Sequence, residues 1–297
     1  MPYVLFLLIS LIWSTSFILM KKATLGFTPL SIGAWRCIWG ALVLGMICWR
    51  RKELMPSLRS NWLAMALVTL VGCAWPYAIQ PFVVTRQGSA FMALAVSFVP
   101  LATIFASVAL LRVWPTTRQI LGVCGALGCL FLLLLDGLDR NISPVDFALA
   151  MSVPVGYAIA NTVIRGWLSE MHATTLTFYL LTATSLLLLP FTLVETSPPT
   201  ASPTWCLAAV SLVTLGALGT GLGTYWFNQL IRDHGPLFAG MVTNVVPIGA
   251  VLWGWADNEQ VTIRQSIALA GIVAMVVLVQ FGAARNAVHF DPQIPQE

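Results

Sequence analysis

Polar side chains lie within several apolar stretches of this sequence, where they can hydrogen-bond a polar molecule. Tyr157 and Asn161 are four residues apart, and Tyr225 and Asn228 are three apart, so each pair shares one helix face. Burying an unpaired polar group in lipid is unfavourable, so we expect both pairs to face the protein interior. Two interpretations stay open: the pairs line a binding cavity, or they hydrogen-bond neighbouring helices.

A second set of side chains forms candidate walls of the same cavity. Each has a competing structural role: hydrogen bonding between helices for the amides, an interfacial belt for the aromatic residues, and core packing for the methionine. The candidates are Trp13, Ser16, Trp75, Tyr77, Gln80, Met92 and Asn244.

Arg36 is the charged residue that lies well inside an apolar stretch, about 12 Å by helical rise from the start of that stretch. One hypothesis is that it anchors a carboxylate of a bound molecule. The other is that it is structural, with its charged end at the membrane interface or on backbone carbonyl groups.

Enzymatic and metal-dependent chemistry is not indicated. His172, His234 and His289 fall between or after the apolar stretches, and no His-Glu-x-x-His or paired-acid motif occurs within them. The six cysteines form no Cys-x-x-Cys motif, which argues against a metal site or a disulfide framework. We therefore expect no catalytic residues, no metal and no cofactor.

The acidic residues lie at the ends of the apolar stretches. Asp136, Asp146, Glu195 and Asp257 all follow this rule, so no carboxylate is available deep in the membrane to carry a proton. The hypothesis is a facilitator or an exchanger, or a carrier that is coupled through a less obvious group.

The elements that position these residues are membrane helices. The chain is 58% hydrophobic and 9% charged, whereas soluble domains carry about 25% charged residues. The net charge of +4 does not indicate nucleic-acid binding, because the basic residues cluster at helix ends beside a membrane. The expected partners are a lipid bilayer and a small molecule.

Spanning the bilayer takes roughly 20 apolar residues as helix, and ten stretches meet that rule. The fold class predicted is an all-α membrane protein with ten transmembrane helices. The predicted spans are residues 3–20, 29–49, 62–82, 88–111, 119–136, 145–165, 174–194, 205–228, 236–256 and 266–284.

Glycine and proline interrupt some of these spans. Pro100 and Pro247 predict helix breaks, which membrane proteins tolerate where helices pack closely or line a cavity. Gly219 and Gly223 form a small-xxx-small face, for which close helix packing is the favoured interpretation and gating the alternative.

The chain contains an internal repeat. Gly88-x-x-Phe91 and Val99-Pro100 recur 147 residues later, and Thr116-x-Arg118-Gln119 recurs 146 residues later. We predict two five-helix units, residues 1–140 and 141–284, followed by a polar tail, 285–297. Because five is odd, the second unit must be inverted in the membrane, as in many secondary transporters.

Counting Lys and Arg predicts the orientation. Placing the N-terminus in the cytoplasm leaves nine basic residues inside and five outside, which favours both termini in the cytoplasm. Lys21 and Lys22 argue the other way.

The chain resembles the EamA-type ten-helix carriers of the drug/metabolite transporter superfamily. The resemblance covers about residues 3–284 and is carried by Pro100, Pro247 and the runs IWSTSF from Ile12, AWR from Ala34 and EQVTIRQ from Glu259. It departs where Val113 stands for the first-repeat glutamate and Asn258 for a glycine.

That resemblance implies export or exchange of a small metabolite, such as an amino acid or a drug-like molecule, through a central cavity. It also favours the structural role for Arg36, since the family's arginine looks peripheral to the cavity. The alternative functions are a membrane-embedded enzyme or a channel.

Overall fold

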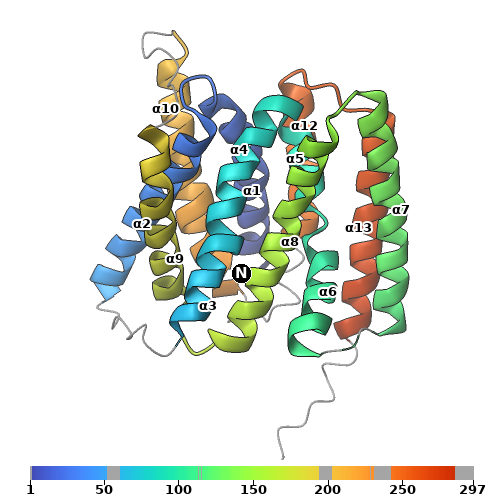
Figure 1. The fold of residues 1–297 in the computed structure, drawn as a ribbon, viewed down its shortest axis with the longest axis horizontal. Helices are drawn as coiled ribbons and strands as arrows, with labels where there is room; N and C mark the ends of the chain where they lie inside the picture. Colours follow the sequence, from blue (N-terminus) through green and yellow to red (C-terminus); the bar gives the residue numbers. More distant parts are fainter. Residues whose placement is uncertain are drawn as a thin grey trace, which may run out of the picture.

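The computed structural model describes residues 2–51, 61–112, 114, 116–193, 203–227, 229–230 and 242–284. Within these ranges the secondary structure is helical, with no strand (Figure 1). Long apolar segments adopt helices in a membrane because a helix satisfies each backbone N–H and C=O within the segment itself. The predicted all-α class is confirmed.

The helices of the first part of the chain, in order, are α1 (Pro2–Ala23), α2 (Pro29–Arg51), α3 (Trp62–Leu67), the π-helical segment η1 (Val68–Ala74), α4 (Trp75–Gln87), α5 (Ser89–Val96), α6 (Val99–Leu111) and α7 (Thr117–Asp139). Those of the second part are α8 (Pro144–Trp167), α9 (Ala173–Leu188), the short 3₁₀ segment η2 (Leu189–Leu193), α10 (Trp205–Thr214), the π-helical segment η3 (Leu215–Leu222), α12 (Val242–Ala256) and α13 (Ile263–Ala284).

In the described ranges, eight helical segments are long and apolar enough to cross a membrane. They fall on the first eight predicted spans. Two shorter apolar segments, Val245–Ala256 and Ile263–Met275, overlap the ninth and tenth. A multi-pass membrane protein is therefore shown, and ten complete spans stay a prediction.

Four predicted spans are not uniform α-helices, and one of them, residues 174–194, ends in the 3₁₀ segment η2. Residues 62–82 and 205–228 each contain a π-helical segment, and residues 88–111 divide into α5 and α6. That division follows from Pro100, which has no N–H to donate to the carbonyl of Val96, the last residue of α5. Pro247, by contrast, lies inside the continuous helix α12.

The two π-helical segments occupy equivalent places in the repeat. Leu215, the first residue of η3, lies 147 residues after Val68, the first residue of η1. The segment η1 packs against α8 and α9, whereas η3 packs against α1 and α2. Each π-helical segment thus packs on the first two helices of the other half of the chain.

The remaining contacts between the halves are also reciprocal, because equivalent helices pack against equivalent partners in the other half. Helix α6 packs on α8 as α12 packs on α1, while α2 pairs with α9 and α7 pairs with α13. Figure 1 shows α7 and α13 side by side at one edge of the bundle. The core lies where these helices cross, and it contains large fully buried side chains such as Phe91, Met92 and Leu215.

Candidate functional site

Arg36 lies buried in the bundle with only 6% of its surface exposed. Its Nε donates a hydrogen bond of 3.0 Å to Thr220 Oγ1, and its Nη1 donates one of 3.3 Å to Gln80 Oε1. The two acceptors come from η3 and α4, so one side chain of α2 connects both halves of the chain.

Two tyrosines complete this group. The Arg36 guanidinium carbon lies 4.4 Å from the centroid of the Tyr77 ring, and Gln80 Nε2 donates a hydrogen bond of 2.9 Å to the Tyr157 hydroxyl. We call these five residues the Arg36 cluster: Arg36, Tyr77, Gln80, Tyr157 and Thr220. A cation, an amide and three hydroxyl-bearing side chains thus meet among apolar helices.

The π-helical turn of η3 places Thr220 at this point. Its hydroxyl donates a hydrogen bond of 3.2 Å to the carbonyl of Leu215, five residues earlier. Gly216, in the same segment, lets α2 come close, because a Cβ there would lie 2.6 Å from Trp39 Cβ and 2.9 Å from the Arg36 carbonyl oxygen. π-Helical segments are often found at functional sites.

The described residues provide no ion-pair partner for Arg36. Their ion pairs instead gather at the end of the bundle that carries the turns after α4, α7 and α12 (upper end in Figure 1). We call this group the polar end cluster; it comprises Lys21, Lys22, Arg86, Asp136, Asp139, Arg140, Asp146, Asp257, Glu259 and Arg264.

The end of α1 is held to the turn that follows α12. Lys21 pairs with Asp257 at 2.7 Å and with Glu259 at 2.8 Å, and Lys22 also pairs with Asp257. Glu259 in turn accepts hydrogen bonds of 2.9 Å from the backbone N–H groups of Ser89 and Ala90. It therefore caps the start of α5, whose free N–H groups attract a negative charge.

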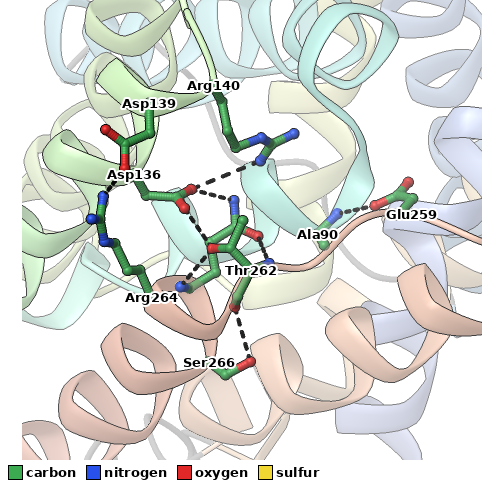
Figure 2. A network of polar contacts seen from close by, with 9 residues as sticks. Ala90, Asp136, Asp139, Arg140, Glu259, Thr262, Arg264 and Ser266 are labelled. Carbon is green, nitrogen blue, oxygen red and sulfur yellow. Dashed lines mark hydrogen bonds and ion pairs between the residues drawn. The ribbon is translucent and has the colours of Figure 1, made fainter.

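The end of α7 is held to the start of α13. Asp136, only 2% exposed, accepts hydrogen bonds from the Thr262 hydroxyl and, at 2.8 Å, from Gln265 Nε2, and Arg264 pairs with Asp139 (Figure 2). A third contact joins α4 to α8, where Asp146 accepts from Arg86 at 3.1 Å and from Gln87 at 2.9 Å. All these pairs link residues 1–140 to residues 141–284.

The environment of the two acids after α12 keeps them ionised. Burial raises the pKa of Asp257, but the hydrogen bonds from Lys21 and Lys22 outweigh it, so the pKa lies below its usual value. For Glu259, burial likewise raises the pKa, while Lys21 and the N–H groups of Ala90 and Ser89 lower it further than burial raises it.

Comparison with known proteins shows which family has this arrangement of helices. The model of the EamA-like transporter family matches the chain twice, over residues 1–135 and 147–281. The chain belongs to the EamA-like transporter family. The double match covers most of the sequence and makes this protein a membrane transporter of the drug/metabolite transporter type.

A solved structure titled "Crystal structure of protein" has the same fold as this EamA-like transporter. The TM-score is 0.67 at 19% sequence identity, over 96% of this chain and 98% of that one. Comparison with curated protein sequences found no match.

In this EamA-like transporter, α1 packs closely against η3. Trp13 Nε1 donates a hydrogen bond of 3.1 Å to the Gly219 carbonyl oxygen. A Cβ at Gly219 would lie 2.5 Å from Ser16 Oγ, and one at Gly223 would lie 2.7 Å from Trp13 Nε1. The two glycines therefore allow the approach of α1, and Ser16 bonds the Ile12 carbonyl of its own helix.

The other predicted cavity residues are dispersed. Met92 is fully buried in the main apolar core, Trp75 Nε1 donates to Ser152 Oγ at 2.8 Å, and the Arg51 guanidinium lies 5.3 Å from the Tyr225 ring centroid. Asn161 is exposed. Asn228 lies outside the described residues, as does the side chain of Asn244, whose backbone belongs to α12.

Three of the predicted residues, Tyr77, Gln80 and Tyr157, are brought together with Arg36. Sequence reasoning missed Thr220, because a threonine within a glycine-rich apolar run has no distinguishing pattern. It also missed the pairing partners of the end acids. The available signal was that Glu259 and Asp257 follow one predicted span while Lys21 and Lys22 follow another.

Proposed function

We propose that this protein is a secondary transporter in which two inverted five-helix halves, 1–140 and 141–284, alternate access to a shared site for a small metabolite. The observation that carries the proposal is the one-sided distribution of charge pairs. The ion pairs that join the halves among the described residues all lie at one end of the bundle. Charge pairs between the halves hold this end closed, whereas the described contacts at the other end contain no ion pair between the halves.

The repeat supports inversion. The two π-helical segments are in register with the 147-residue repeat, and each packs against the first two helices of the opposite half. Exchange of equivalent helices between halves is the packing expected of two halves related by a two-fold axis, and an inverted repeat with such an axis has two end states of similar construction.

At the opposite end, the described contacts between the halves are weaker in kind. Asn61 Nδ2 donates a hydrogen bond of 3.1 Å to the Trp167 carbonyl oxygen, and Arg51 lies on the Tyr225 ring. Of the described polar contacts at this end, opening breaks one neutral hydrogen bond and one cation–π contact. Opening the polar end requires the separation of several charge pairs, so the state described here is the one closed at the polar end.

The predicted orientation places the polar end outside the cell and both termini in the cytoplasm. The state with this end closed is then the inward-facing one. The Arg36 cluster lies between the halves, since Arg36, Tyr77 and Gln80 come from the first and Tyr157 and Thr220 from the second. Rocking of one half against the other must therefore alter the cluster, as a transport site requires.

Cross-linking at the polar end tests the proposal. Cysteines replace Lys22 and Asp257 in a background where the two exposed native cysteines, Cys124 and Cys206, are changed to alanine. The protein is reconstituted in liposomes and assayed with a panel of amino acids and cationic drugs. We expect a short bifunctional thiol reagent to stop uptake, and a reducing agent to restore it if the reagent is cleavable.

The matched control places cysteines at Arg165 and Ser169, two exposed positions four residues apart at the end of α8 and so within one half. The same reagent should leave uptake by this variant at the level before cross-linking. Undiminished uptake by the cross-linked Lys22–Asp257 variant would contradict alternating access. It would favour a channel, which conducts without closing one end.

A further inference from the structure

We infer that the Arg36 cluster is a binding site for the carboxylate of a small solute, with Arg36 as the group that pairs with it. This inference rests on the proposed transport function and adds the chemical class of its substrate. It differs from the structural interpretation in assigning the buried charge a partner that is part of the cargo.

The first argument is an uncompensated charge. Arg36 is 6% exposed, its side-chain contacts are an amide oxygen, a hydroxyl and an aromatic face, and no described carboxylate pairs with it. Buried charges in proteins are normally paired, and arginines within membrane helices mark ion or substrate paths. The buried acids Asp136 and Asp146 are engaged by other partners at the polar end. The carboxylate of a ligand would supply the negative charge that the described residues do not provide at Arg36.

The second argument is geometric. Arginine has five N–H donors, and the two donated bonds use Nε and one N–H of Nη1. In the described structure the outer edge of the guanidinium, formed by Nη1 and Nη2, keeps its remaining donors. A carboxylate fits that edge through two parallel hydrogen bonds. Thr220 and Gln80 hold Nε and Nη1 respectively and so fix the plane of the group.

The third argument is a second donor beside the first. The Tyr157 hydroxyl oxygen accepts from Gln80 Nε2 at 2.9 Å, which leaves its own proton for another acceptor. Gln80 thereby links Arg36 and Tyr157, so both can bind one ligand. Half-buried Tyr77, under the guanidinium, provides an aromatic surface next to the charge.

The fourth argument is that α2 carries positive charge whereas its equivalent helix in the other half does not. The same helix carries Arg50 and Arg51 in its last turn, at the end opposite to the polar end cluster, so positive charge lies both at that end and at the cluster. Helix α9, which pairs with α2 across the repeat, contains no charged residue in its sequence ATTLTFYLLTATSLLL. The charge of Arg36 is therefore a feature of one half alone and not part of the repeated framework.

Thermal unfolding of the purified full-length protein in detergent tests the site. The probes are the common amino acids, acetate, benzoate and succinate, each compared with its uncharged amide. We expect at least one acid to raise the unfolding temperature more than its amide. In Arg36→Gln the half-saturating concentration of that acid should rise about tenfold or more, as loss of a charged hydrogen bond predicts. Arg36→Lys should fall between the two.

A second variant keeps the inference testable if Arg36→Gln does not fold. Gln80→Glu places a carboxylate within reach of Arg36 and so supplies the counter-charge from the protein. We expect this variant to fold, and to lose stabilisation by acids while Arg36 is intact. Arg165→Gln, an exposed arginine in the last turn of α8, removes the same charge elsewhere and should bind acids as the wild type does.

Three results would overturn the inference: no acid stabilises the wild type more than its amide, Arg36→Gln keeps the preference for acids, or Gln80→Glu still binds them. Transport measurements separate this failure from failure of the proposed function. If the protein transports neutral or cationic compounds and Arg36→Gln does not change that uptake, the transport proposal stands and the carboxylate site is contradicted. If no compound is taken up although acids still bind, the transport proposal alone is contradicted.

Discussion

The guanidinium carbon of Arg36 on α2 lies 4.4 Å from the centroid of the Tyr77 ring on α4. The arginine is thus held by an aromatic face on one side and by the hydrogen bonds to Thr220 and Gln80 at its edges. Helices α2 and α4 belong to the same half, so this contact can persist while the halves move.

Removal of the Tyr77 ring should destabilise the protein. We expect Tyr77→Leu to lower the free energy of unfolding by about 1–2 kcal/mol, because a desolvated cation–π contact is lost. Tyr77→Phe keeps the ring and should stay close to the wild type. Thermal unfolding in detergent measures both, and equal losses in the two variants would show that the hydroxyl is what matters.

Loss of the Glu259 carboxylate should loosen the start of α5. Glu259→Gln removes the charge that accepts from the N–H groups of Ser89 and Ala90 and pairs with Lys21. We expect a loss of about 1–2 kcal/mol, as for other helix caps. Faster backbone hydrogen exchange should be confined to the first turn of α5. Glu170→Gln, on an exposed glutamate, is the matched control and should change neither quantity.

The polar end should weaken in acid. The folded-state pKa values of Asp257 and Glu259 are lowered, so their contribution to stability is complete above the unfolded values of about 4 and is lost as pH falls through the lowered values. We expect the unfolding temperature to be insensitive to these groups from about pH 5 to 8. At pH values below about 4 we expect the unfolding temperature to decrease. The Asp257→Asn, Glu259→Gln double variant should show a smaller acid-induced decrease; an identical decrease would contradict the assignment.

A side chain at Gly216 should separate α2 from η3. A Cβ there would meet Trp39 Cβ at 2.6 Å and the Arg36 carbonyl oxygen at 2.9 Å, and backbone cannot move aside cheaply. We expect Gly216→Ala to lose about 1–3 kcal/mol of stability and to disturb acid binding at Arg36. Gly128→Ala on α7 meets no atom within 4 Å and should be neutral or stabilising, because alanine favours helix. Similar losses in both variants would refute the packing argument.

Several features follow from the sequence alone because they depend on local order. Apolar stretches of about 20 residues predict membrane helices without any knowledge of their neighbours. The 147-residue repeat predicts duplication, and Pro100 predicts the break that separates α5 from α6. Tyr77, Gln80 and Tyr157 were identified as polar or aromatic candidates because such groups are expensive to bury in lipid.

Only the tertiary structure decided which of these candidates meet. Arg36 is 44 residues from Gln80 and 184 from Thr220, and no periodicity relates positions so far apart on different helices. The π-helical turn of η3 changes which side chains face α2, and hydropathy does not report such a turn. The pairs at the polar end likewise depend on which helix ends lie together. Hydrophobic burial determines how many helices form, whereas their packing determines which polar groups become partners.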